Sequence, residues 1–155
     1  MVKILMVCHG NICRSPMAEF ILREMAEKRG LSRDIFCASA ATSTEEIGNP
    51  VYPPAKQKLW ELGIDCRGKR ARQMTKADYG EYDYLIGMEN RNLMNMRRIC
   101  GGDPEGKIHL LLEDAPFPRD IDDPWYTGDF DTACREIQEG CSLWLDRLAK
   151  ELKRA

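Results

Sequence analysis

A short loop near the start of the chain constrains the fold more than any other segment. Residues 2–8 are continuously apolar after their one lysine and predict a buried strand, and residues 16–29 predict a helix. Between these two elements, five residues separate Cys8 from Arg14. Because a strand runs almost directly into a helix, the loop's backbone N–H groups and the helix N-terminus point at one spot, which predicts an anion-binding site.

The residue types in this loop predict covalent phosphoryl transfer. The positive end of the helix dipole favours the thiolate form of Cys8, which is the nucleophilic form. The planar guanidinium of Arg14 is suited to grip two phosphoryl oxygens at once. A cysteine and an arginine placed in this way between a strand and a helix are typical of a phosphatase that forms a cysteinyl intermediate.

The cysteine-to-arginine spacing decides little by itself, because the chain contains it three times. The copy at residues 66–72 follows only a short apolar segment. The copy at residues 141–147 lies in an amphipathic helical pattern, whose backbone N–H groups are already hydrogen-bonded. Only residues 8–14 combine the spacing with a strand, a glycine, small polar residues and a helix start, so the context carries the prediction.

The composition indicates one globular domain in a reducing compartment. A net charge of −2 argues against bulk binding to nucleic acid or to acidic membranes. No apolar stretch is long enough to span a membrane, and the N-terminus lacks a signal-peptide pattern. The 7 cysteines are odd in number and scattered, and no cysteine–histidine spacing indicates a metal site. We therefore expect a single cytoplasmic, monomeric domain over residues 1–155, with no cofactor and no metal.

Strand-like and helix-like segments alternate along the chain. Strands are predicted at residues 2–8, 34–39, 82–87 and 107–112. Helices are predicted at residues 16–29, 55–62, 89–99 and 130–152, with long loops at 40–54 and 113–127. This alternation predicts an α/β three-layer sandwich, in which a central four-stranded parallel sheet carries helices on both faces. The phosphate-binding loop after the first strand then lies at the carboxyl ends of the strands, where such sheets bind ligands.

A second motif, close to the last helix, supplies an acid. Displacing a phenol from phosphorus requires a proton for the leaving oxygen, and a carboxylic acid on a loop is suited to give it. Asp123 is followed by Pro124, which stiffens the loop. Trp125 and Tyr126 come next and are suited to stack on an aromatic leaving group. The alternative is that the Asp-Pro pair only starts a turn and the aromatic residues cover a helix end.

Together these motifs resemble the low-molecular-weight protein tyrosine phosphatases. The matching segments run in family order and cover almost the whole chain; they are residues 7–16, 39–43, 47–50, 72–73, 75–76, 82–84 and 123–126. The resemblance implies hydrolysis of phosphotyrosine in proteins through a cysteinyl-phosphate intermediate, with no cofactor. It also implies phosphoprotein substrates, among them a tyrosine autokinase in a bacterium, and inhibition by phosphate and vanadate.

The resemblance further implies a role for each matching residue. Cys8 would attack phosphorus, Arg14 would bind the phosphoryl oxygens, and Asp123 would act as acid and then as base. The residues expected to bind substrate are His9, Gly10, Asn11, Ile12, Cys13, Ser15, Trp125 and Tyr126. Cys13 would lie near Cys8, where it either forms a reversible disulfide under oxidation or is a small core residue.

Three residues are expected to support the loop, and two positions depart from the family pattern. Asn11 would hold the loop in a strained shape and share a hydrogen bond with Ser39, and Ser15 would donate to the Cys8 sulfur. Glu45 falls where many relatives carry a bulky pocket-wall residue, and would disfavour acidic substrates. Lys69 falls where some relatives carry a histidine, so no role is carried over to it.

Three other activities fit parts of the pattern. A thiol-dependent arsenate reductase shares the fold and the loop but requires a closely spaced pair of downstream cysteines, whereas Cys100 stands alone in its region. Protein-arginine phosphatases tend to carry threonine where this chain has Ile12. A non-catalytic phosphoprotein-binding module is expected to have lost its nucleophile or its acid. The tyrosine phosphatase hypothesis is therefore preferred, with the reductase and the arginine phosphatase as alternatives.

Overall fold

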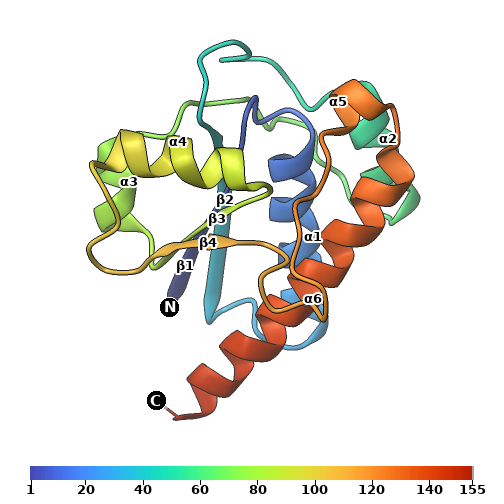
Figure 1. The fold of residues 1–155 in the computed structure, drawn as a ribbon. Coiled ribbons are helices and arrows are strands. Elements are labelled where there is room, and N and C mark those ends of the chain that lie inside the picture. Colours follow the sequence, from blue (N-terminus) through green and yellow to red (C-terminus); the bar gives the residue numbers. More distant parts are fainter. Residues whose placement is uncertain (155) are drawn as a thin grey trace.

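A four-stranded sheet lies at the centre of the computed structural model, which describes residues 1–154 (Figure 1). The strands are β1 (Val2–Cys8), β2 (Ile35–Ala41), β3 (Tyr84–Gly87) and β4 (Ile108–Leu110). They pair in the order β2-β1-β3-β4, and every pair is parallel. The carboxyl ends of all four strands therefore meet at one edge of the sheet, which is where parallel sheets bind ligands.

Helices cover both faces of this sheet (Figure 1). They are α1 (Arg14–Lys28), α2 (Pro53–Glu61), α3 (Lys76–Glu81), α4 (Asn90–Cys100), α5 (Pro124–Thr127) and α6 (Phe130–Arg154). Helices α3 and α4 lie on one face and α1 and α6 on the other, while α2 packs against α1 and α6. The predicted three-layer α/β sandwich is confirmed. Within residues 1–154, no helix has both the length and the apolar character needed to cross a bilayer.

Strand β1 is buried on both faces because it lies between β2 and β3. Ile4 and Met6 belong to the apolar core under α1 and α6. Leu5 and Val7 belong to the second core, under α3 and α4. Successive side chains of a strand point to opposite faces, so a strand covered on both sides needs a continuous apolar run. This burial explains the uninterrupted apolar sequence that leads to Cys8.

Helix α6 crosses very close to the segment that follows β4. The indole Nε1 of Trp144 donates to the carbonyl oxygen of Leu111 at 3.1 Å. A Cβ added at Gly140 would lie 2.6 Å from Cγ of Leu111 and 3.1 Å from its carbonyl oxygen, so this approach requires glycine. A long segment runs from here to Asp123 at the carboxyl edge of the sheet, and this contact fixes the start of that segment.

Most element boundaries shift by one or two residues from the predictions; β2, for example, ends at Ala41 rather than at residue 39, and β4 at Leu110 rather than at residue 112. Three differences bear on the site. The prediction of irregular structure over residues 113–127 is wrong at residues 124–127, where Asp123 caps the single turn of α5. Helix α3 was not predicted, although a capping box between Thr75 and Asp78 marks its start. Helix α1 begins at residue 14 rather than 16, because the end of the phosphate loop already winds into its first turn.

A polar cluster holds the turn after β4. Oε2 of Glu113 is 2.9 Å from Nδ1 of His109 and accepts a hydrogen bond from Arg147 at 2.9 Å. Its Oε1 accepts from the backbone N–H of Leu110 at 3.0 Å. Partial burial alone would raise the pKa of Glu113, but these hydrogen bonds outweigh it and lower the pKa to about 2.

We expect Glu113→Gln to lower the free energy of unfolding by about 1–3 kcal/mol at neutral pH. The folded-state pKa lies below the ordinary value of 4.5, so the carboxylate stabilises the fold fully above that pH and progressively less as the pH falls toward 2. Urea denaturation of both proteins across this range measures the difference. The exposed Glu27, changed to Gln, is the control and should have little effect. A deficit that stays constant down to the lowest pH would contradict the account.

Candidate active site

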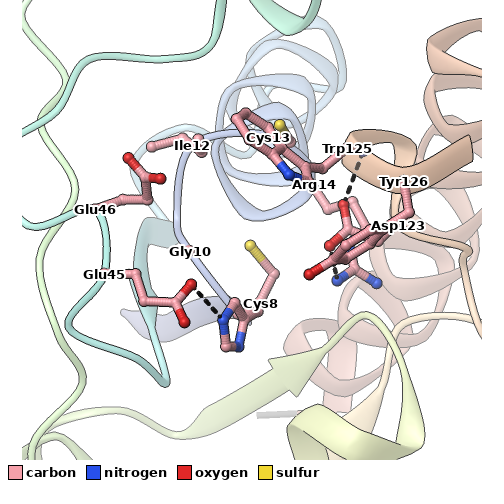
Figure 2. A pocket seen from close by; sticks show the side chains of 11 residues that line it. Cys8, Gly10, Ile12, Cys13, Arg14, Glu45, Glu46, Asp123, Trp125 and Tyr126 are labelled. Carbon is pink, nitrogen blue, oxygen red and sulfur yellow. Dashed lines mark hydrogen bonds and ion pairs between the residues drawn. The ribbon is translucent and has the colours of Figure 1, made fainter. Parts of the chain in front are cut away.

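The segment from Cys8 to Arg14 forms the loop between β1 and α1, at the carboxyl edge of the sheet (Figure 2). Asn11 has a φ of 59°, and it is the one non-glycine residue with positive φ in the described part of the chain. Asparagine adopts this left-handed conformation at a lower cost than most residues. The turn directs the backbone N–H groups of Asn11 and Ser15 toward the Cys8 sulfur, at 3.3 and 3.4 Å.

The Asn11 side chain organises the loop from beneath. Its Oδ1 accepts from the backbone N–H of Arg72 at 3.2 Å, and this contact sets which way the amide faces. Its Nδ2 then donates to the hydroxyl of Ser15 at 2.7 Å and to that of Ser39 at 2.9 Å. Both hydroxyls therefore accept from Asn11 and have their own protons available for other partners.

The two hydroxyl protons, of Ser39 and Ser15, are donated to different acceptors. The Ser39 hydroxyl donates to Oε1 of Glu19 at 2.5 Å. The Ser15 oxygen lies 3.0 Å from the sulfur of Cys8 and 3.5 Å from the carbonyl oxygen of Ala40, so the sulfur is its closer partner. With the two backbone N–H groups, three donors surround the sulfur. Such a set of donors is suited to an anionic thiolate.

Arg14 is buried to 1% exposure beside the sulfur. It donates to the carbonyl oxygen of Ile121 at 2.8 Å and pairs with Glu89 at 3.4 Å and with Asp123 at 3.3 Å. Desolvation works against its charge, but the negative potential of Cys8, Asp123 and Glu89 prevails and raises the pKa of Arg14. Its Nε is buried with no hydrogen-bond partner among the described residues, so one donor of the fork remains for a ligand.

Asp123 lies at the start of α5, opposite the loop (Figure 2). One carboxylate oxygen accepts from the backbone N–H of Trp125 at 3.1 Å, and the other is the partner of Arg14. The Trp125 ring packs against Tyr52 with 4.7 Å between ring centroids, which holds it at the mouth. Tyr126 is 81% exposed beside it. The loop, an acid and two aromatic side chains thus surround one pocket.

The pocket brings together most of the predicted site residues. It is lined by Cys8, His9, Gly10, Ile12, Cys13, Arg14, Glu45, Glu46, Asp123, Trp125 and Tyr126. Asn11 and Ser15, predicted among the substrate-binding residues, have their side chains beneath the loop rather than in this lining. Ser39 lies in the supporting network, as predicted. Within residues 1–154, no group of three or more His, Cys, Asp or Glu side chains is placed to hold a metal ion.

Comparison with known proteins identifies the family. The family model of the low molecular weight phosphotyrosine protein phosphatases matches residues 3–154. The chain belongs to this family. It is 40% identical to the low molecular weight protein-tyrosine-phosphatase YfkJ of Bacillus subtilis, over 97% of this chain and 98% of that protein. The chain is thus a protein-tyrosine phosphatase by family, and the resemblance read from its motifs is confirmed.

Solved structures of relatives agree with the fold of this phosphatase. The crystal structure of YfkJ from Bacillus subtilis superposes with a TM-score of 0.92, covering 97% of this chain and 96% of that one. Vibrio vulnificus Wzb in complex with benzylphosphonate superposes with a TM-score of 0.83, at 29% identity, covering 94% of this chain and 98% of that one. Neither alternative activity, arsenate reduction or arginine dephosphorylation, is favoured by these relatives.

The sequence did not predict two acidic residues in or beside the phosphatase pocket. Glu46 lines the pocket, and Glu89 reaches Arg14 from the residue that caps α4. Glu89 had a usable signal, because it follows the carboxyl end of β3 and so lies at the ligand-binding edge. The only sequence signal for Glu46 was its neighbour Glu45, which falls at a pocket-wall position of the family and does line the pocket.

Lys69 makes contacts that the sequence did not predict. Its ammonium donates to the carbonyl oxygen of Ser39 at 3.0 Å and lies 3.5 Å from Oε1 of Glu19. Burial lowers the pKa of Lys69, and the charge of Glu19 offsets part of this effect. The other oxygen of Glu19 pairs with Arg23 at 2.8 Å. Lys69 therefore lies in the polar network beneath the phosphate loop.

Cys13 is buried in the pocket wall and, like Cys8, is a free cysteine. Burial, together with the nearby negative groups Cys8 and Asp123, raises the pKa of Cys13 well above that of an ordinary thiol. Cys13 is therefore protonated at neutral pH. The disulfide between the two residues stays a prediction.

We expect Asn11→Ala to destabilise this phosphatase more than Asn11→Gly does. Both changes remove the hydrogen bonds to Ser15, Ser39 and the Arg72 amide, at a cost of about 2–4 kcal/mol for the buried groups left unpaired. Alanine should cost about 1 kcal/mol more, because only glycine adopts a φ of 59° without strain. Thermal and urea unfolding measure both values. Equal stability of the two variants, or a more stable alanine variant, would contradict the role of backbone conformation here.

Proposed function

We propose that this phosphatase hydrolyses protein phosphotyrosine with Cys8 as the nucleophile, Arg14 as the phosphoryl-binding residue and Asp123 as the acid and base. One observation supports this assignment above the others. The Cys8 sulfur lies at the floor of the pocket among three hydrogen-bond donors, beside a buried arginine whose Nε is unpaired. A sulfur in this setting is activated as a thiolate, and the donors around it are suited to phosphoryl oxygens.

The first step transfers the phosphoryl group to sulfur. The Cys8 thiolate attacks phosphorus, an S–P bond forms, and the bond between phosphorus and the tyrosine oxygen breaks. Asp123, in its acid form, gives its proton to that oxygen, so that tyrosine leaves as the neutral phenol. Arg14 and the loop N–H groups stabilise the charge on the phosphoryl oxygens in the transition state.

The second step releases phosphate. The Asp123 carboxylate takes a proton from water, the water oxygen attacks phosphorus, and the S–P bond breaks. The Ser15 hydroxyl, 3.0 Å from the sulfur, donates to the departing thiolate. Inorganic phosphate leaves, and Cys8 is again a thiolate and Asp123 again an acid, as at the start of the cycle.

The shape of the mouth supports an aryl phosphate as substrate. Cys8 is only 3% exposed, so a phosphoryl group must reach down to it on a long, narrow side chain. Trp125 and Tyr126 line one side of the opening, where they are suited to stack on a phenol ring. The relative Wzb was crystallised with benzylphosphonate, a compound that joins an aromatic ring to a tetrahedral phosphonate, which agrees with this proposal.

We further propose the wider setting of the reaction. Free phosphate and vanadate would compete with substrate for the loop, and a tyrosine autokinase is one phosphoprotein suited to be a substrate. The enzyme would be a cytoplasmic monomer with one domain over residues 1–155. The family match across residues 3–154 supports the single domain. The seven free cysteines support the cytoplasm, since a reducing compartment keeps thiols free.

Phosphate release from phosphotyrosine, phosphoserine and phosphoarginine peptides, with arsenate reduction assayed in parallel, tests the proposed function. We expect turnover of phosphotyrosine alone, and its loss to background in Cys8→Ser, because a serine hydroxyl is a far weaker nucleophile here. The control is Cys100→Ala, which changes a buried cysteine at the C-terminal end of α4 and should retain turnover. Near-normal turnover in Cys8→Ser would rule out the covalent mechanism. Arsenate reduction or phosphoarginine turnover would instead support one of the alternatives.

Asp123→Ala should slow hydrolysis of an alkyl-substituted phenyl phosphate by about 10²–10⁴-fold. The loss should be much smaller for an aryl phosphate whose phenol leaves readily as an anion, because such a leaving group needs no proton. Steady-state rates over a series of substituted phenyl phosphates measure the dependence on leaving-group acidity. Asp122→Asn, at the exposed neighbour, is the control. An equal loss over the whole series would show that Asp123 is not the acid.

A further inference from the structure

Two glutamates form the wall of the pocket that faces Trp125 and Tyr126. Glu45 and Glu46 both belong to the loop after β2, and both line the pocket (Figure 2). In Figure 2 their side chains lie on one side of the opening, with Cys8 between them and the aromatic wall. A phosphotyrosine ring that enters between the two walls therefore brings its neighbouring residues close to two carboxylates.

These carboxylates differ from the others of the site in having no lysine or arginine partner among the described residues. Asp123 and Glu89 both contact Arg14. Glu45 instead lies 2.9 Å from Nε2 of His9, and Glu46 accepts from the neutral amide of Asn49 at 2.6 Å. A site that receives a phosphoryl dianion thus carries at its entrance two carboxylates that no lysine or arginine contacts.

Backbone contacts hold this acidic wall in place. The backbone N–H of Ser43 donates to the carbonyl oxygen of His9 at 3.0 Å, which ties the start of the loop to the phosphate loop. The backbone N–H of Tyr52 donates to Ile12 in the same way at 2.9 Å. Cγ of Glu46 also lies 3.4 Å from the position that a Cβ on Gly10 would occupy. The two carboxylates are therefore presented at a defined place.

The cleft on the other side of His9 carries charges of both signs. It is lined by one cation, Arg91, and by the four carboxylates of Glu89, Asp120, Asp122 and Asp123, of which Glu89 and Asp123 contact Arg14. One of these carboxylates, Asp120, is engaged by the backbone and side-chain N–H groups of Asn90 at 2.8 Å each. Arg14 and Arg91 offset much of the negative charge of this cleft, whereas no lysine or arginine contacts Glu45 or Glu46, so the wall of these two glutamates is the selective element of the entrance.

We propose that Glu45 and Glu46 select phosphotyrosine segments with lysine or arginine next to the phosphotyrosine, and reject segments with aspartate or glutamate there. A basic neighbour supplies the cation that the two carboxylates lack, whereas an acidic neighbour adds a third negative charge to the entrance. The inference rests on the proposed function, because it concerns peptides whose phosphotyrosine enters the pocket above Cys8.

Three phosphotyrosine peptides that differ only in the residues flanking the phosphotyrosine, either lysine, glutamine or glutamate, provide the test. For the unmodified phosphatase at low ionic strength, kcat/KM for the lysine peptide should exceed that for the glutamate peptide by about five- to fifty-fold. The ratio should fall to within about threefold in the double variant Glu45→Gln/Glu46→Gln, and should invert in Glu45→Lys/Glu46→Lys. Added salt should also reduce it.

A matched control removes the same net charge far from the pocket. Glu27 and Asp34 are exposed at the opposite end of the sheet, so Glu27→Gln/Asp34→Asn should keep the unmodified ratio. The glutamine peptide is the reference within each variant, so that a general loss of activity does not affect the ratio.

A ratio near one in the unmodified phosphatase would overturn the inference and leave the proposed function intact. A large ratio that survives Glu45→Gln/Glu46→Gln would overturn the assignment to these two residues. Failure of all three peptides to release phosphate, with every protein, would instead overturn the proposed function and this inference with it.

Discussion

The site depends first on the orientation of one buried amide. The backbone N–H of Arg72 can only donate, so it determines which end of the Asn11 side chain is the acceptor. The other end must then donate to Ser15 and Ser39, and this leaves the Ser15 proton for the Cys8 sulfur. A single contact between segments 61 residues apart thus determines the direction of a chain of hydrogen bonds that ends at the reactive atom.

Arg14 is the point at which the two sides of the fold meet. It begins α1 on one face of the sheet, and its partner Glu89 caps α4 on the other. Its second partner, Asp123, caps α5 at the end of the long segment after β4. Removing a guanidinium from water is costly, and these partners offset that cost while holding the fork beside the sulfur. The same carboxylates occupy the one buried arginine of the pocket, so the glutamates at its entrance, which no lysine or arginine contacts, affect which peptides are attracted.

Features encoded within a few neighbouring residues could be predicted from the sequence. The apolar run of β1 and the loop from Cys8 to Arg14 are examples, because each depends on local geometry. Contacts across long sequence separations could not be predicted. Lys69 under Ser39 and Glu89 beside Arg14 depend on how the helices pack, and neither residue differs locally from an ordinary surface residue. Nothing in the residues around Lys69 indicated its contact with the Ser39 carbonyl oxygen, 30 residues away in the sequence.

In the proposed reaction, the phosphoryl group passes through the sulfur of Cys8. Mass spectrometry of the phosphatase, denatured rapidly during turnover of a phosphotyrosine peptide and then digested, tests this most directly. We expect the peptide containing Cys8 to gain the mass of one phosphoryl group. With a good leaving group, Asp123→Asn should increase the fraction of enzyme trapped as the cysteinyl phosphate. Cys8→Ser should abolish this intermediate. Two results would contradict this mechanism. One is a phosphoryl group on another residue. The other is turnover by Asp123→Asn with no phosphoryl group on Cys8, under conditions in which this variant should accumulate it.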